Sequence, residues 1–456
     1  MTFEQLNMHP SILKAITQDG YETPTDIQAE AIPHLINGQD ILGSAQTGTG
    51  KTAAFALPII HHVQNMPNDG KKRLPKALIL APTRELALQI KDSFDRYSRK
   101  NDVKAVAIYG GMPKRKQIIK VKRGVDILIA TPGRLLDLMN MKVIKLSTIR
   151  HFVLDEADQM LDMGFIDDVD TIIRALPKNR QTMMFSATIP KEIQALSKRI
   201  LTNPVRIEIT PQNTPLKTIN QSVFFLKGSD KIKLLKDTVL GENITSALVF
   251  VRTKRDCDAI ARQLTDAGVN ADAIHGDRTQ SQRQKTLNQF KRHETKVLVA
   301  TDVAARGIDI DALSHVINFD MPEKPETYLH RIGRTARAGK LGSAYSFCSP
   351  KETHLLKAIQ KHVEMRLPVS SDHEYIQKQK PAPRKHANRA NDQNNGPKHD
   401  RFQSGQSAKK KKSKNKRNFE QYAVESRSSN RKNTKKTFKN KGKKKAFNKP
   451  AYQRAY

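Results

Sequence analysis

A glycine-rich segment near the N-terminus has the residue types and spacing that bind phosphate groups. It reads Ala45, Gln46, Thr47, Gly48, Thr49, Gly50, Lys51 and Thr52, and stands between a strand-like run at 40–42 and a helix-prone run at 53–56. Its glycines let backbone N–H groups approach phosphate oxygens, and the positive end of the following helix adds attraction. Lys51 can then reach the β- and γ-phosphates, and the Thr52 hydroxyl can ligate Mg²⁺. An ordinary glycine-rich turn is the alternative, because Ala45 stands where this motif usually begins with glycine.

Carboxylates follow a second strand-like run, Phe152–Leu154. Ligands of open parallel sheets bind beyond the carboxyl ends of the strands, where Asp155, Glu156 and Asp158 would lie. Asp155 could hold Mg²⁺ through water, and Glu156 could orient the water that attacks a γ-phosphate. An acidic turn that opens a helix is the alternative for this segment on its own. The phosphate loop makes that alternative much weaker.

The elements that must position these groups alternate between strands and helices. In the first 377 residues, short apolar runs alternate with longer amphipathic stretches, which is typical of βαβ units around a parallel sheet. A proline-containing segment, Thr210–Pro215, interrupts the alternation. The predicted strands are 77–80, 105–108, 126–129, 152–154 and 182–185 before this break, and 247–251, 296–300, 315–318 and 344–347 after it. The sequence therefore predicts two α/β domains and a linker.

The charge is distributed unevenly along the chain. The 456 residues carry 80 Lys plus Arg against 45 Asp plus Glu, a net charge of +35. From Lys378 to Tyr456 there are 26 basic and 4 acidic residues, a net of +22. This tail has one valine, Val424, and no Leu, Ile or Met, so it cannot bury enough apolar surface to fold. We expect it to be disordered.

The composition also excludes several classes of protein. The two cysteines, Cys257 and Cys348, are too few for a disulfide framework or a four-cysteine zinc site, so we expect lone buried thiols in a reducing compartment. No apolar stretch is long enough to span a bilayer, and charged residues interrupt the first twenty positions. We expect a cytoplasmic protein with no membrane partner.

The tetrad Asp155–Asp158, Asp-Glu-Ala-Asp, resembles the signature of DEAD-box ATP-dependent RNA helicases of superfamily 2, and further motifs follow in that family's order. The chain is most similar to the bacterial RhlE-type and cold-shock members. The resemblance covers about residues 1–370. Its other segments are Phe3, Gly20–Gln28 (the Q motif), Pro82–Leu86, Gly110–Gly111, Thr131–Arg134, Ser186–Thr188, Leu248–Val251, Gln280–Arg283, Thr301–Asp309 and His330–Arg337.

The resemblance implies an α/β fold with two RecA-like parallel-sheet domains in tandem and a disordered basic C-terminal tail. The implied ATP-binding domain covers 1–209 with the Q motif at about 1–29, the linker 210–217, the helicase C-terminal domain 218–370 and the RNA-binding tail 371–456. The implied activity is RNA-dependent ATP hydrolysis to ADP and phosphate, with ATP and Mg²⁺ as cofactors. The protein would use this activity to separate short RNA duplexes or to remodel RNA–protein complexes in ribosome assembly, RNA decay or cold adaptation.

The resemblance also assigns the nucleotide site. Besides the phosphate loop from Ala45 to Thr52, it implies that Gln28 reads adenine, that Tyr21 and Phe3 lie beside the ring, and that Asp309 contacts the ribose. An amide can both donate to and accept from a base, and an aromatic ring can stack on it. Core packing is the alternative for both aromatic residues.

Three arginines at intervals of three residues, Arg331, Arg334 and Arg337, would lie along one face of a helix. A solvated basic face is the usual explanation of such a stripe. The resemblance implies instead that Arg334 and Arg337 approach the γ-phosphate as arginine fingers. Ala336 stands where the family usually has glycine, which is costly if its φ angle is positive. The catalytic candidates are Lys51, Asp155, Glu156, Arg334 and Arg337, and the metal candidates are Thr52 and Asp155.

Two further groups complete the implied site. Asp158, Ser186, Thr188, His330 and Arg331 would couple the nucleotide to the RNA, with strand-end capping as the alternative for the hydroxyls. The expected RNA contacts, mostly donors that hold phosphates without reading bases, are Thr83, Arg84, Gly110, Gly111, Thr131, Arg134, Gln280, Arg283, Thr301 and Arg306.

Basic runs and isolated aromatic residues alternate in the tail, which would attract phosphates and stack on unpaired bases. A tail that only improves solubility or holds any polyanion is the alternative. RNA is the expected main partner, with ribosomal or RNA-decay complexes beside it. Two other functions stay open: an ATP-gated RNA clamp or scaffold, and a DNA helicase, because phosphate contacts cannot distinguish RNA from DNA.

Overall fold

A computed structural model describes residues 1–45, 48–66, 73–209, 219–241, 244–305, 308, 310, 313–336, 341–371 and 373–375. The expected linker at 210–217 and nearly all of the expected tail lie outside these residues. The chain divides into one unit over 1–382 and a second over 383–456, which is not described. Everything below concerns the first unit.

The first sheet has seven parallel strands in the order β3-β4-β2-β5-β6-β1-β7. Five of them are the predicted strands, within one residue at each end. The strands are β1 (Ile41–Ser44), β2 (Ala77–Leu80), β3 (Ala105–Ile108), β4 (Ile127–Ala130), β5 (His151–Leu154), β6 (Gln181–Ser186) and β7 (Val205–Glu208).

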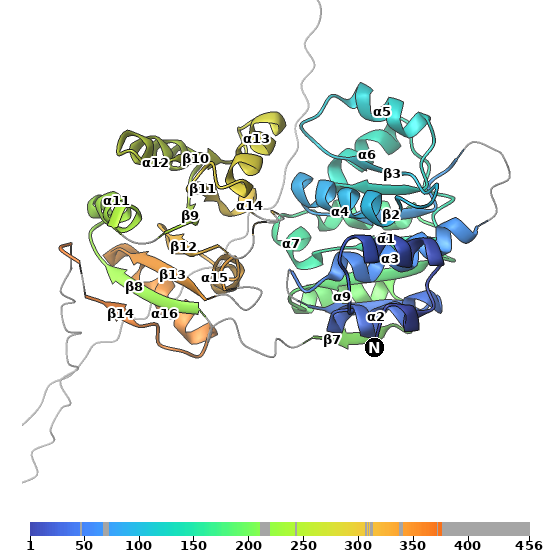
Figure 1. Cartoon of the computed structure of the whole chain (residues 1–456), viewed down its shortest axis with the longest axis horizontal. Helices are drawn as coiled ribbons and strands as arrows, with labels where there is room; N and C mark the ends of the chain where they lie inside the picture. The colour runs from blue at the N-terminus through green and yellow to red at the C-terminus, as the bar shows by residue number, and fades with distance from the viewer. Residues whose placement is uncertain are drawn as a thin grey trace, which may run out of the picture. The chain divides into compact units, whose positions relative to one another are not determined.

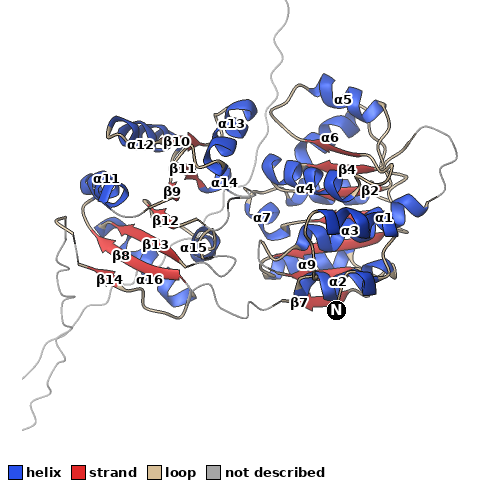
Figure 2. Ribbon diagram, viewed as in Figure 1, coloured by secondary structure: helices blue, strands red, loops and turns tan. Residues whose placement is uncertain are grey.

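Helices cover both faces of this sheet, as the ribbons show (Figure 2). One face is covered by α1 (Pro10–Gln18), α2 (Asp26–Ile36), α3 (Lys51–Asn65) and α4 (Arg84–Tyr97), with the short 3-10 turn η1 (Glu4–Leu6) beside them. The other face is covered by α5 (Lys114–Lys122), α6 (Pro132–Asn140), α7 (Ala157–Asp162), α8 (Ile166–Arg174) and α9 (Lys191–Ile200). In Figure 1, α5 and α6 lie at the β3 end of the sheet and α2 lies at the β7 end.

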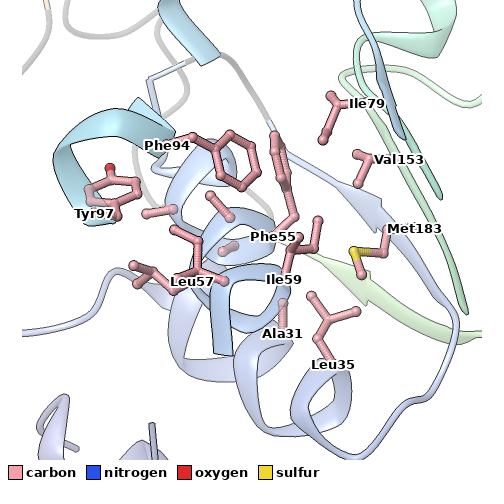
Figure 3. Close-up of a cluster of buried hydrophobic side chains, with 14 of the residues drawn as sticks. Ala31, Leu35, Phe55, Leu57, Ile59, Ile79, Phe94, Tyr97, Val153 and Met183 are labelled. Carbon is pink, nitrogen blue, oxygen red and sulfur yellow. The ribbon is translucent and has the colours of Figure 1, made fainter. Parts of the chain in front are cut away.

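The core under α3 fixes the position of the phosphate loop. Phe55 of α3 is fully buried, with ring centroids 5.6 Å from Phe185 of β6 and 6.4 Å from Phe94 of α4. Figure 3 shows this ring between α3 and the sheet, near Ile79 and Val153. Because α3 begins at Lys51, this packing holds the end of the loop at the carboxyl edge of the sheet.

The second sheet repeats the architecture, with seven parallel strands in the order β10-β11-β9-β12-β13-β8-β14. The strands are β8 (Ile219–Phe225), β9 (Ala247–Val251), β10 (Ala271–Ile274), β11 (Val297–Thr301), β12 (His315–Asn318), β13 (Gly342–Cys348) and β14 (Val369–Ser370). The helices α11 (Lys231–Gly241) and α12 (Lys254–Asp266) pack in one core cluster. Two other clusters contain α13 (Gln280–Lys291), α14 (Asp302–Ala305), α15 (Pro325–Ile332) and α16 (Thr353–His362), and the 3-10 turns are η2 (Gly228–Asp230) and η3 (Pro350–Glu352).

Four strands were not predicted, and three of them lie at a sheet edge. β7, β10 and β14 each have at most four residues, and charged side chains interrupt the apolar pattern of the first two. β8 contains Asn220, Gln221 and Ser222 among its apolar residues. Local hydrophobicity is a weak signal for such strands, because partner strands far away in the sequence supply their backbone hydrogen bonds.

The expectation of lone buried thiols is confirmed. Cys257 and Cys348 are both free and fully buried. Burial raises the pKa of the Cys257 thiol to about 12 and that of Cys348 to about 11. Within the described part of the chain, no helix combines the length and apolarity that crossing a membrane requires.

A buried histidine at the start of β5 makes acid destabilisation a testable property. His151 stacks on His62 of α3 with centroids 5.1 Å apart, and its Nδ1 lies 2.9 Å from Oε1 of Gln181. Burial, and then the charge of His62, lower the pKa of His151 from 6.5 to about 4.

The folded protein therefore binds fewer protons at His151 than the unfolded chain does between pH 6.5 and pH 4. This contribution to stability is complete above pH 6.5 and declines as the pH falls, by about 2 kcal/mol at pH 5. Replacing His151 with Gln should reduce the shift of the first sheet's urea midpoint between pH 7 and pH 5. The same replacement at exposed His354 of α16 is the control and should leave that shift unchanged.

Candidate active site

The phosphate loop connects β1 to α3, as predicted. Gly48 and Gly50 have φ angles of 86° and 95°, which favour glycine. Lys51 is buried, and its Nζ donates to the carbonyl oxygen of Ala45 at 2.7 Å. The ammonium group is thus folded over the loop at the start of α3, while Gln46 and Thr47 lie outside the described residues.

Gln28 joins the start of α2 to the phosphate loop. Its Nε2 donates to the carbonyl oxygen of Gly50 at 3.2 Å, and its Oε1 accepts from the backbone N–H of Thr25 at 3.1 Å. A Cβ atom at Gly50 would collide with this amide, so glycine is required there for packing as well as for its φ angle. Among the described residues the second N–H of Nε2 has no acceptor, while the two hydrogen bonds tie Gln28 to the loop and to the start of α2.

The two aromatic residues of the Q motif differ in position. Phe3 is 3% exposed and belongs to the core cluster under α1 and α2. Tyr21 is half-buried, meets Phe3 edge-on at 6.1 Å and shares a 2.9 Å hydrogen bond with the hydroxyl of Tyr97. Tyr21 lines the cavity of about 670 Å³ that is described below, whereas Phe3 is not among the described residues that line it. Phe3 therefore supports Tyr21 from behind.

Asp155 and Glu156 follow β5 directly and are both buried. Glu156 has φ 52° and ψ 52°, a left-handed conformation that is strained for glutamate. Among the described residues, its Oε2 has no hydrogen-bond partner. Burial raises the pKa of Asp155. Burial, followed by the charge of Asp155, raises the pKa of Glu156 to about 7, although Lys51 and Arg334 oppose the rise.

These groups line one cavity of about 670 Å³, which we call the nucleotide cavity because it contains the predicted nucleotide-site residues. It combines a loop for phosphates, two buried carboxylates and a guanidinium group from the second sheet's half of the unit. Arg334 is buried, and its Nη1 donates to the carbonyl oxygen of Ile308 at 3.0 Å. The lining includes Tyr21, Thr25, Gln28, Gly48, Gly50, Lys51, Thr52, Asp155, Glu156, Lys291, Ile308 and Arg334.

The segment Ser186–Thr188, whose hydroxyls belong to the predicted coupling group, lies beside Asp158. Oδ2 of Asp158 accepts from the backbone N–H of Thr188 at 2.9 Å and from its hydroxyl at 3.0 Å. The Ser186 hydroxyl accepts from the backbone N–H of Asp158 at 3.2 Å and donates to the carbonyl oxygen of Thr188 at 2.7 Å. This network ties the start of α7 to the end of β6 beside Glu156. Asp158 and Thr188 also line a second cavity of about 800 Å³ together with His330.

The expectation that three arginines share one helical face is wrong. α15 ends at Ile332 with Gly333 as its C-cap, so Arg334 lies beyond the helix. Nε and Nη2 of Arg331 donate to the two carboxylate oxygens of Asp302 at 2.6 and 2.7 Å. Its Nη1 donates to Oδ1 of Asn318 and to the carbonyl oxygen of Asp320. Arg331 therefore binds groups of the second sheet's half of the unit, whereas Arg334 lines the nucleotide cavity. Arg337 and Asp309 lie outside the described residues.

Ala336 has a φ angle of 54°, so this alanine is in the left-handed conformation. That conformation costs a non-glycine residue roughly 1 to 2 kcal/mol. Replacing Ala336 with Gly should therefore stabilise the second sheet by about 1 kcal/mol, after the larger entropy loss of glycine is subtracted. The change in the unfolding midpoint measures it. Ala267, with φ −88°, is the matched control, and its replacement by Gly should lower the midpoint.

A third cavity, of about 500 Å³, collects most of the predicted RNA contacts, and we call it the motif cavity. The Thr83 hydroxyl caps α4 by accepting from the backbone N–H of Leu86 at 3.2 Å. Arg84 packs on the Gly110–Gly111 backbone so closely that a Cβ atom at Gly111 would collide with it. The lining is Pro82, Thr83, Arg84, Glu85, Gly110, Thr131, Gly133, Arg134, Asp137, Met163, Phe165, Gly276, Arg283 and Val303.

Several predicted RNA contacts already have protein partners. Arg283 donates to Oε1 of Glu85 at 2.7 Å, and Gln280 donates to the same oxygen at 3.2 Å. Nη1 of Arg134 donates to the carbonyl oxygen of Met112 at 3.0 Å. Thr301 ends β11, and Arg306 lies outside the described residues. Glu85 was missed because the sequence does not show which arginine a buried carboxylate will pair with.

Comparison with known proteins agrees with this geometry. Residues 25–196 match the family model for the DEAD/DEAH box helicase, and residues 230–339 match the helicase conserved C-terminal domain. The chain is 41% identical over 368 residues to the DEAD-box ATP-dependent RNA helicase CshA of Bacillus subtilis (strain 168), covering 80% of this chain and 73% of CshA.

Two further proteins extend the comparison. The ATP-dependent RNA helicase CshA of Listeria monocytogenes is 43% identical over 367 residues, with 80% of this chain and 69% of that protein covered. The structure of Saccharomyces cerevisiae Dbp5 bound to RNA and ADP BeF3 matches with a TM-score of 0.73 and 33% identity, over 81% of this chain and 95% of that one.

Proposed function

Because this chain belongs to the DEAD-box ATP-dependent RNA helicases, we propose that it hydrolyses ATP when RNA is bound and thereby separates short RNA duplexes or remodels RNA–protein complexes. One observation carries the proposal. The nucleotide cavity brings Lys51 and Glu156 of the first sheet together with Arg334 of the second.

The chemistry of hydrolysis follows from the placement of the charges. Glu156 orients the attacking water and draws its proton, and its raised pKa of about 7 suits a group that exchanges a proton near neutral pH. Lys51 and Arg334 stabilise the negative charge that spreads over the transferred phosphoryl oxygens. Their burial strengthens both contributions, because little water screens them.

The donor set also fits Mg²⁺. Thr52 and Asp155 line the same cavity and supply hydroxyl and carboxylate oxygens, which this hard cation prefers. The orphaned Oε2 of Glu156 further indicates a polar occupant beside them. In the described residues no three His, Cys, Asp or Glu side chains form a metal cluster, so water and ATP phosphates would complete the coordination. Bound Mg²⁺ would neutralise charge on the phosphates.

The second part of the proposal concerns RNA binding at the motif cavity. Arg84, Gly110 and Thr131 present donors for phosphates without reading bases. The cavity is also lined by Gly276 and Val303 from the second sheet's half, and the nucleotide cavity likewise has lining from both halves. A ligand that contacts both halves favours the state in which they are together, so ATP and RNA strengthen each other's binding.

The biological setting is part of the same proposal. We place the protein in the cytoplasm, acting on structured RNA in ribosome assembly, RNA decay or cold adaptation, with ribosomal or RNA-decay complexes as partners. The basic tail from Lys378 to Tyr456 would hold the RNA near the two sheets.

ATP turnover without nucleic acid, with RNA and with DNA, alongside strand separation of a short duplex, tests the proposal. We expect stimulation by RNA and ATP-dependent separation of the duplex. Stimulation without separation would indicate an ATP-gated clamp. Equal stimulation by DNA would contradict RNA as the substrate, because the family assignment implies a preference that depends on the 2′-OH group.

A further inference from the structure

We infer that α5 is a second RNA-binding surface, which holds phosphates of RNA that extends beyond the motif cavity. The inference rests on the proposed function, since it assumes that RNA occupies that cavity. It concerns the basic face of α5, made of Arg115, Lys116, Lys120, Lys122 and Arg123.

The charge of this helix is one-sided. From Lys114 to Arg123 there are six basic residues and no acidic one. All five members of the basic face are exposed, and within the described ranges no carboxylate lies at ion-pair distance from them. Lys116, Lys120 and Arg123 follow one another at intervals of four and three residues, so they form one stripe on the helix. Such a stripe matches a row of backbone phosphates.

The helix keeps these charges at a cost to its own stability. The residues Lys114, Arg115 and Lys116 occupy the first turn, where the helix dipole disfavours cations. No side chain caps its N-terminus, where Pro113 stands, and no acidic residue lies in that turn. Lys116 and Lys120 are also like charges four residues apart, which repel each other. These exposed charges break several local rules and add nothing to the packing of the core, which indicates a functional surface.

A single buried residue fixes α5 beside the double glycine. Gln117 accepts from the backbone N–H of Tyr109 at 3.1 Å and donates to its carbonyl oxygen at 3.0 Å. Ile118 and Val121 pack on the core of the same face of the sheet. Tyr109 directly precedes Gly110, a lining residue of the motif cavity. The basic face is therefore held in a fixed position relative to the proposed phosphate contacts.

The first residue of α5 also reaches the rim of that cavity. Nζ of Lys114 lies 3.0 Å from Oδ2 of Asp137, and Asp137 lines the motif cavity. The basic face of α5 therefore begins one residue after a side chain at this rim, within reach of RNA that extends out of the cavity. A purely solvated basic face requires neither the anchor at Gln117 nor this contact with the rim.

The triple variant K116Q/K120Q/R123Q of the full chain tests the inference. Its Kd for the extended RNAs described below should rise at least tenfold at 0.1 M salt. The slope of log K against log salt for these RNAs should become shallower by about two to three. The KM for RNA should rise while kcat at saturating RNA stays unchanged. The thermal midpoint should not fall, because the substitutions remove like-charge repulsion. The charge-retaining variant K116R/K120R/R123K should keep wild-type affinity.

The control is K351Q/K357Q/K361Q, which removes the same charge from exposed lysines of η3 and α16. Three RNAs locate the contact: a short single strand, the same strand with a single-stranded extension, and the same strand with a duplex arm. Loss confined to the extended RNAs supports the inference and identifies the segment that α5 holds. Loss equal to the control's, or equal for all three RNAs, overturns it. A wild-type protein that RNA does not stimulate would instead overturn the proposed function.

Discussion

Replacing Glu156 with Gln should lower the rate of RNA-stimulated ATP turnover by roughly 10²- to 10⁴-fold, the usual contribution of a positioned acid or base. Glutamine keeps the shape of the side chain but cannot accept the proton of the attacking water. ATP binding should persist or strengthen, because the substitution removes a negative charge from a buried site that receives phosphates. Steady-state turnover and ATP affinity measure the two effects separately.

Glu30→Gln is the control for this prediction. Glu30 is exposed on α2, and its neutralisation should leave turnover unchanged. If the Glu156 variant retained wild-type turnover, the proposed role of Glu156 would be wrong. A loss of ATP binding in that variant would show that the carboxylate supports the loop rather than the reaction.

Replacing Lys231 with Met should destabilise the second sheet by about 3 to 5 kcal/mol, because it removes the buried cation that lies nearest to the carboxylate of buried Glu352. Lys231 is 4% exposed. Its Nζ lies 2.7 Å from Oε2 of Glu352 and 3.3 Å from Oδ1 of Asp320. Burial favours the neutral form of Glu352, but the hydrogen bond and charge of Lys231 outweigh it and hold its pKa below the usual range. Denaturant unfolding monitored in the second sheet measures the loss.

Lys233→Met is the matched control on the same helix. Lys233 is exposed and lies 3.3 Å from Asp230, a surface pair whose loss costs about 1 kcal/mol or less. Adding Glu352→Gln to the Lys231 variant should recover part of the stability, because it removes a buried negative charge that has lost its nearest cation. Equal destabilisation by both lysine replacements would contradict the buried network.

The catalytic edge of the first sheet could be predicted because its signals are local. The glycines around Lys51 reflect a backbone that must approach phosphates, and the apolar run before Asp155 identifies a buried strand. The parallel arrangement then brings both to one edge without any knowledge of side-chain contacts. Short apolar runs also identify most of the strands of this sheet, although β7 was missed.

Contacts between distant segments could not be predicted. Lys231 looks like a surface cation in the first turn of a helix until Glu352, 121 positions later, packs against it. The regular spacing of Arg331 and Arg334 suggested one helical face, but the helix ends between them. Arg331 then pairs with Asp302 of α14, and Arg334 lines the nucleotide cavity. In each case the partner, rather than the local pattern, decides the role.

The central claim is that ATP and RNA stabilise the same state of the protein. The most direct measurement is the Kd for RNA with and without ATP in the Glu156→Gln variant, together with the Kd for ATP with and without RNA. We predict that each ligand tightens the other by the same factor, within the roughly 5- to 150-fold range of coupled sites. RNA affinity that is identical with and without ATP would contradict the account.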